Sequence, residues 1–141
     1  MLRAGLIATA FVLVAQSASA QQTGFYGGTA QERRFAKAFY EDHKEEGIEY
    51  VSVSFRLMTL TIYPSEPLYK SWLSSDATAR INIMGYCEEY LEQLKERFKN
   101  RAIKLSVKVR YPNSRQAYEQ MIGEMTWAPG SEEPEFTFIK K

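Results

Sequence analysis

The chain has 141 residues, of which 18 are basic, 17 are acidic and 45% are hydrophobic, and its formal net charge is +1. This length suits one domain with a hydrophobic core, and the balanced charge excludes a general attraction to nucleic acid or to anionic membranes. With one cysteine and one histidine, the chain lacks the residues for a disulfide framework or a typical zinc site, so we expect no metal and no cofactor.

The N-terminus has the three parts of a secretory signal peptide. Arg3 supplies a positive charge, residues 4–14 form an uncharged apolar run, and Ala18-Ser19-Ala20 fits the pattern of a cleavage site. The run is too short to span a membrane, which takes about 20 apolar residues. We therefore predict a signal peptide at residues 1–20, export to the periplasm or the extracellular space, and no transmembrane anchor after cleavage. The alternative is an N-terminal helix of the mature protein.

The next segment predicts a lead-in and a capped helix. Residues 21–28 are polar and glycine-rich, which indicates a flexible lead-in to a single domain over residues 29–141. Thr29 and Glu32 have the spacing of a capping box. The apolar residues that follow at helical spacing are Phe35, Ala38 and Phe39. With Gly47 as its end, the pattern predicts a helix from about 30 to 45.

Residues 48–63 alternate apolar and hydroxyl side chains, and the phase of this alternation changes at Arg56 and Leu57. A turn at that point gives a self-consistent hairpin register with one apolar side and one hydroxyl side. The apolar pairs are Phe55–Met58, Val53–Leu60 and Val51–Ile62, and the hydroxyl pairs are Ser54–Thr59, Ser52–Thr61 and Tyr50–Tyr63. Because Arg-Leu lacks the preference of tight hairpin turns for positive φ, one long bulged strand is the alternative.

Residues 64–75 begin with two prolines and predict a loop that contains one helical turn. Tyr69, Trp72 and Leu73 in this loop have two interpretations. They form an exposed apolar anchor for a partner, since aromatic residues are enriched in interface hot spots, or they fold back as a lid on the core.

The strongest helical pattern covers residues 77–99. Its apolar stripe, which we expect to face the core, consists of Ala77, Ile81, Met84, Cys87, Leu91, Leu94 and Phe98. Residues 102–111 then alternate as a half-buried strand, with apolar side chains on one face and Lys104, Lys108 and Arg110 on the other.

The C-terminal part predicts one more helix and a short edge strand. The helix runs from about 113 to 125, with an inner side formed by Tyr118, Met121, Ile122 and Met125, although Gly123 weakens this pattern. The tail at 135–141 (EFTFIKK) has the alternation of an edge strand.

These elements give the order α-β-β-α-β-α and predict an α+β fold. We expect a two-layer sandwich, with helices on one face of a small, mostly antiparallel or mixed sheet. The third strand lies beside either the first or the second, and the pattern does not choose between them. In architecture alone, residues 30–111 resemble the small BON modules of bacterial envelope proteins. They lack the glycines that such modules place around the second strand and before the last one.

Three groups of residues are of types that can take part in catalysis or metal binding. Cys87 and His43 are a nucleophile and a base by type, but Cys87 lies on the apolar stripe and is expected to be a core residue. His43 lies among acidic residues and predicts a solvated helix end. The helical carboxylates, expected to be surface charges paired with Lys95 and Lys99, are Glu88, Glu89, Glu92 and Glu96.

The sequence therefore predicts a small exported binding or interaction domain, and it leans away from an enzyme. The expected partner is a protein or an anionic envelope component, held by the hydroxyl-rich basic face with Lys104, Lys108 and Arg110, or by Tyr69 and Trp72. The alternative for the basic face is an ordinary solvated surface whose lysines protect an edge strand. The alternative functions are a structural subunit of a cell-envelope assembly and, less favoured, a small hydrolase or transferase. The oligomeric state stays open.

Overall fold

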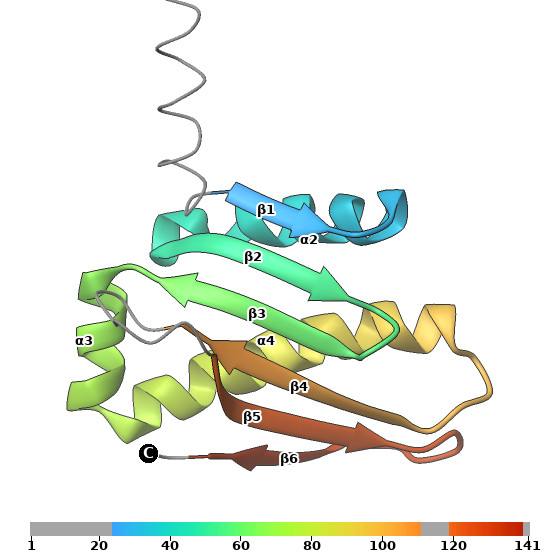
Figure 1. Ribbon diagram of the computed structural model, residues 1–141. Coiled ribbons are helices and arrows are strands. Elements are labelled where there is room, and N and C mark those ends of the chain that lie inside the picture. The colour runs from blue at the N-terminus through green and yellow to red at the C-terminus, as the bar shows by residue number, and fades with distance from the viewer. Residues whose placement is uncertain (1–23, 111–118, 140–141) are drawn as a thin grey trace, which may run out of the picture.

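The computed structural model describes residues 24–110 and 119–139. The predicted signal peptide at residues 1–20 lies outside these residues. Within the described parts, the chain folds into three α-helices, one short 3-10 helix and six strands (Figure 1). No helix in those parts is long and apolar enough to cross a bilayer.

The six strands form one mixed sheet in sequence order. The strands are β1 (Gly24–Gly27), β2 (Ile48–Ser54), β3 (Thr59–Pro64), β4 (Ile103–Val109), β5 (Gln120–Trp127) and β6 (Glu135–Phe138). The pairs β1–β2 and β3–β4 are parallel, and the other three pairs are antiparallel. Thus the third predicted strand, β4, lies beside the second one, β3.

All helices pack on one side of this sheet, which confirms the predicted α+β sandwich (Figure 1). They are α2 (Ala30–His43), the 3-10 helix η2 (Lys44–Glu46), α3 (Glu66–Ser74) and α4 (Asp76–Arg97). Helix α2 covers β1 and β2, and α4 crosses β4, β5 and β6. The other face of the sheet carries no helix within the described residues.

The first helix begins at the predicted capping box. The Glu32 backbone N–H donates to Thr29 Oγ1 at 3.1 Å, and the Thr29 N–H donates to Glu32 Oε1 at 2.9 Å. The other carboxylate oxygen of Glu32 accepts the Phe55 N–H at 2.7 Å. Glu32 is 7% exposed, so one buried carboxylate joins the start of α2 to the end of β2. At the far end, Gly47 terminates η2 at φ 117°.

The hairpin register is confirmed pair by pair from Tyr50–Tyr63 to Ser54–Thr59. Its turn also explains why Arg56 and Leu57 are tolerated. The Met58 N–H donates to the Phe55 carbonyl at 3.1 Å, and Met58 itself takes the positive φ of 53°. The left-handed residue therefore follows the Arg-Leu pair instead of lying within it.

Helix α4 is correctly placed, but its inner face is rotated from the predicted stripe. The buried residues are Ala79, Ile83, Tyr86, Cys87, Tyr90, Leu91 and Leu94. Ala77 is exposed and Ile81 is 64% exposed. The prediction was wrong at this end because Tyr86 and Tyr90 supply part of the inner face, and their hydroxyls find hydrogen-bond acceptors there.

Two predicted elements and the lead-in differ in the structure. The segment expected as a loop with one helical turn contains α3, a helix of nine residues capped by Ser65. The helix expected from 113 to 125 is wrong where residues are described, because residues 120–127 form β5; residues 111–118 lie outside the described parts. Part of the lead-in is β1, which the sequence did not predict. The expected edge strand at the C-terminus is confirmed as β6.

Candidate binding surface on the open face of the sheet

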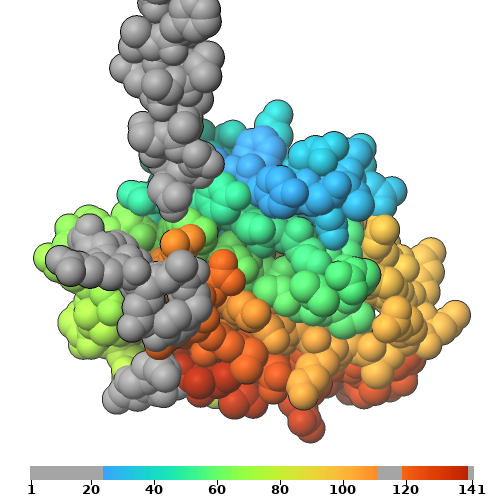
Figure 2. Space-filling model, in the orientation of Figure 1, coloured from blue at the N-terminus to red at the C-terminus, as the bar shows by residue number. Residues whose placement is uncertain are grey.

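The side chains that point away from the helices form what we call the open face. From β2 to β5 this face carries Tyr50, Ser52, Ser54, Thr59, Thr61, Tyr63, Lys104, Ser106, Lys108 and Glu124, and Arg110 directly follows β4. Figure 2 shows the open face toward the viewer, with β2 and β3 in green above β4 in orange. The strand register thus brings Lys104, Lys108 and Arg110 onto one surface with the paired hydroxyls, as their alternation predicted.

Tyr50, Tyr63 and Arg110 form one row across β2, β3 and the end of β4. Tyr26 on β1 pairs with Ser52 and so lies diagonally beside Tyr50. We call these four residues together the tyrosine–arginine row. The rings of Tyr50 and Tyr63 lie 4.8 Å apart between centroids. Arg110 donates from Nη1 to the Tyr63 hydroxyl at 3.1 Å, and its guanidinium lies 5.6 Å from the ring centroid. Adjacent Tyr26 is 56% exposed.

Tyr50 stays protonated at neutral pH. Burial raises the pKa of Tyr50, and the neighbouring hydroxyls of Tyr63 and Tyr26 raise it further. Neutral phenols offer both a donor and an acceptor, together with an apolar ring. The row is therefore suited to ligands with hydroxyl groups and flat apolar faces.

The basic residues of the open face differ in how far they are neutralised. Lys104 lies 3.7 Å from the Glu124 carboxylate on β5. Lys108 stands beside Thr61 on β3 and, within the described parts of the chain, has no ion-pair partner. Arg110 donates to the Tyr63 hydroxyl and has no carboxylate partner among the described residues. Within that part of the chain, the open-face positive charges without an ion-pair partner are those of Lys108 and Arg110, next to the tyrosines.

The two aromatic site candidates from the sequence lie elsewhere. Trp72 is 6% exposed and belongs to the core. Within the part of the chain that the structure describes, its Nε1 has no hydrogen-bond partner. Tyr69 is half-buried on the same helix, α3. This placement fits the lid on the core, and it is incompatible with Trp72 as an exposed anchor.

Cys87 is a core residue, as expected. Its side chain is fully buried, and Gly123 of β5 packs beside it. Burial, with a smaller effect of Glu88, raises the pKa of the thiol to about 12. The reactive thiolate is therefore negligible at neutral pH, and Cys87 is unsuited to nucleophilic catalysis.

His43 is the centre of a polar cluster, so the predicted solvated helix end is wrong. Its Nδ1 lies 2.9 Å from Glu46, and its Nε2 lies 2.8 Å from Glu89 on α4. The Tyr86 hydroxyl donates to Glu46 at 3.2 Å. The His43 side chain is only 16% exposed because the rings of Phe39 and Tyr86 contact it. This cluster ties the end of α2 to the middle of α4.

The His43 cluster predicts a loss of stability in mild alkali. Burial lowers the pKa of His43, but the hydrogen bonds and charges of Glu89 and Glu46 outweigh it, and the pKa lies above its ordinary value of 6.5. A raised pKa means that the cluster stabilises the fold fully below pH 6.5 and loses this contribution as the pH rises through the folded-state pKa. Urea unfolding from pH 6 to 9 should show this decrease.

A variant without the histidine tests whether His43 causes this pH-dependent loss of stability. Since the chain has one histidine, His43→Gln should be less stable than the wild type at pH 6 and should lack the decline. The size of the effect is limited because Glu46 is 48% exposed. An equal decline in both proteins would show that His43 does not cause it.

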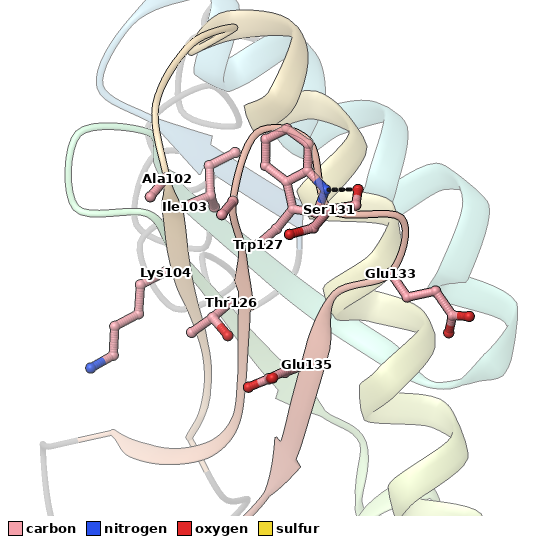
Figure 3. Close-up of a pocket in the computed structure, with 9 residues that line it drawn as sticks. Ala102, Ile103, Lys104, Thr126, Trp127, Ser131, Glu133 and Glu135 are labelled. Atoms are coloured by element: carbon pink, nitrogen blue, oxygen red, sulfur yellow. Dashed lines mark hydrogen bonds between the residues drawn. The ribbon is translucent and has the colours of Figure 1, made fainter.

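Two hollows are lined by described residues, one at the border of the open face and one on the helix side of the sheet. One, of about 370 Å³, lies at the end of β4 and β5, where the Trp127 indole donates to the Ser131 carbonyl at 3.2 Å (Figure 3). Lys104 and Glu133 flank it on opposite sides. The other, of about 400 Å³, lies between α2 and α4 beside Phe35 and Arg97. Among the described residues, no three His, Cys, Asp or Glu side chains are placed to hold a metal ion.

Sequence reasoning found most of the open face but missed Tyr26. The alternation in 48–63 and 102–111 identified every hydroxyl and basic residue of β2, β3 and β4. Tyr26 lies in a stretch of four residues with two glycines, which reads as flexible. The one available signal was the adjacent pair Phe25-Tyr26, in which one ring contacts Tyr40 of α2 and the other points to the open face.

The chain matches no protein-family model, no curated protein and no solved structure. The architectural resemblance to BON modules therefore has no support from sequence or structure similarity. Function has to be inferred from the residues themselves.

Proposed function

We propose that this chain is an exported, non-enzymatic binding domain whose open face holds an anionic, hydroxyl-rich ligand of the cell envelope, such as an acidic polysaccharide. The observation that carries the proposal is the tyrosine–arginine row beside Lys108. It joins the positive charges of Lys108 and Arg110, phenol hydroxyls and apolar rings on one surface that carries no helix among the described residues.

Each group on this surface has a complementary group in the proposed ligand. Arg110 and Lys108 pair with carboxylates, and the fixed fork of the guanidinium favours bidentate contact. The partly exposed hydroxyls of Ser52, Ser54 and Thr59 exchange hydrogen bonds with sugar hydroxyls, whereas Thr61 is buried. The tyrosine rings offer the flat apolar area on which a sugar ring can lie. An extended ligand suits a flat sheet face better than an enclosed pocket would.

The residues that would carry catalysis are engaged in other roles. Cys87 is buried with a raised pKa, and His43 is held by two glutamates and two aromatic rings. For this reason a hydrolase or transferase is the less favoured function. Export is proposed from residues 1–20 of the sequence, and it agrees with an envelope ligand.

The test is a binding experiment with polygalacturonate as the anionic probe and dextran as the neutral one. We expect the wild type to bind polygalacturonate, with affinity that falls as salt is raised. The double variant Lys108→Gln, Arg110→Gln should bind about 5- to 30-fold more weakly, because each lost charge pair is worth about 0.5 to 1 kcal/mol.

The matched control is Arg34→Gln, Lys37→Gln on α2, which removes the same charges from the opposite side of the molecule. This variant should bind like the wild type. Equal weakening by both double variants would mean that net charge, and not the open face, determines binding. Equal affinity for dextran and polygalacturonate would contradict an anionic ligand.

A further inference from the structure

Among the described residues, β6 is the last strand of the sheet, and no other strand pairs with its outer edge. The Ile139 N–H donates inward to the Ile122 carbonyl at 2.9 Å. Because backbone direction alternates along a strand, the N–H and C=O groups of Phe136 and Phe138 point outward, away from β5. Both phenylalanine side chains are only partly buried on the helix side of the sheet. An edge of this kind is a template for another strand.

An apolar flank of α4 adjoins this edge. The Arg80 guanidinium lies 5.4 Å from the ring centroid of Phe136, which places this side of α4 next to β6, as Figure 1 also shows for the N-terminal half of the helix. At 100° per residue, Ala77, Ile81 and Met84 lie within about 100° of Arg80 on this flank. Ile81 is 64% exposed. These residues make up the part of the predicted apolar stripe that the core of one chain does not use.

We propose that two copies of this chain associate through β6, antiparallel to β6 of the other copy, with the Ile81–Met84 flanks of the two α4 helices packed beside the joint. The inference goes beyond the proposed function and does not depend on it. It explains two separate features with one contact, since the free backbone groups and the unused apolar stripe both lie at this edge.

The β6 sequence is complementary to itself in the antiparallel direction. A two-fold axis at Thr137 places Phe136 opposite Phe138 of the other copy and leaves the two Thr137 side chains facing each other. In this register the outward backbone groups of Phe136 pair with those of Phe138, as an antiparallel ladder requires. Two aromatic cross-strand pairs are formed on the helix side, next to the α4 flanks.

The charges around β6 favour the same arrangement. The described residues at the start of the strand include the exposed carboxylates of Glu132, Glu133 and Glu135. An antiparallel pair keeps the acidic ends of the two strands apart, whereas a parallel pair would bring them side by side. An isologous contact is also the commonest route to a closed soluble oligomer. A second copy is therefore the occupant that fits this edge best.

The two-fold axis would stand perpendicular to the sheet, which gives the dimer one continuous sheet with both helix layers on the same side. Both open faces then point in one direction. A dimer of this form presents two copies of the tyrosine–arginine row to one extended ligand.

Sedimentation equilibrium on the protein purified after export of the full chain tests the proposal. We expect a dimer at concentrations on the order of 10 to 100 µM. Thr137→Lys places two positive charges opposite each other at the axis and should weaken the dimer at least about tenfold. Ile81→Lys, at an exposed site that should leave the monomer folded, should weaken it by a similar factor.

Leu57→Lys is the matched control, because Leu57 is 61% exposed and lies in the β2–β3 turn, away from the β6 edge. It should dimerise like the wild type, and circular dichroism should show all four proteins folded. A wild type that is monomeric at every concentration would overturn the proposal and leave the edge to a strand from a different protein. A dimer that persists in both Thr137→Lys and Ile81→Lys would place the contact elsewhere.

Discussion

Replacing Gly47 with alanine will lower the free energy of unfolding by roughly 2 to 6 kcal/mol. Gly47 has φ 117°, a backbone conformation that costs a residue with a side chain about 1 to 3 kcal/mol. A Cβ atom there would also lie 2.7 Å from Ser65 Oγ and 2.9 Å from Leu68 Cβ, and such overpacking costs about 1 to 3 kcal/mol more. Urea denaturation measures the difference directly.

Gly85→Ala provides the opposite result in the same assay. Gly85 lies inside α4, and a Cβ there would meet no other atom within 4 Å. Alanine in a helix interior is more stable than glycine by about 1 kcal/mol. We therefore expect Gly85→Ala to raise the free energy of unfolding. A Gly47→Ala protein as stable as the wild type would mean that η2 does not end in the left-handed conformation.

Glu32→Ala will cost roughly 2 to 4 kcal/mol, an unusually large effect for a charged residue in the first turn of a helix. The substitution removes the acceptor of the Thr29 N–H, which is worth about 1 kcal/mol as a cap. It also leaves the buried Phe55 N–H unpaired, at a further cost of about 1 to 3 kcal/mol. Thermal unfolding and urea unfolding should both show this loss of stability.

Two further variants test whether the loss of stability comes from the lost hydrogen-bond acceptor. Glu32→Gln keeps a carbonyl acceptor and should lose less stability than Glu32→Ala, while Glu88→Ala, at an exposed position on α4, should change stability by less than about 0.5 kcal/mol. Equal losses in Glu32→Ala and Glu88→Ala would contradict the role of the carboxylate.

The same carboxylate contributes to acid unfolding. Burial raises the pKa of Glu32, but the hydrogen bonds from Phe55 and Thr29 lower it more, so that it lies below its ordinary value of 4.5. A lowered pKa means that the contribution is complete above pH 4.5 and is lost as the pH falls through the folded-state pKa. The Glu32→Gln variant should lose this part of the pH dependence.

The hairpin and β5 show when a strand can be predicted from the alternation of apolar and polar residues in the sequence. In β2 and β3 the alternation was strict, so one register satisfied both faces. In β5 a bulge opposite Val107 and Lys108 turns both Ile122 and Gly123 toward the helices. The bulge also leaves Ile122 and Met125, three residues apart, on one side of the strand. That spacing imitates a helix, and only the pairing with β4 distinguishes the two.

Helix α4 shows a second reason why buried residues are hard to predict from the sequence. Burial of a tyrosine depends on hydrogen-bond partners that are distant in sequence. The ring of Tyr90 is fully buried because its hydroxyl reaches the Ser54 and Thr59 carbonyls at the hairpin end. A pattern based on apolar residues alone therefore placed Ile81 in the core instead. The same reasoning identified the basic residues of the open face, because β4 alternates cleanly, but the Tyr63–Arg110 contact required the β3–β4 pairing.

The most direct test of the open face as a binding surface is NMR chemical-shift mapping with oligogalacturonate. We expect the largest shifts at backbone amides of β2, β3 and β4 around Tyr50, Tyr63 and Lys108, with little change along α2. Shifts confined to the groove between α2 and α4, or no shifts at millimolar ligand, would contradict it.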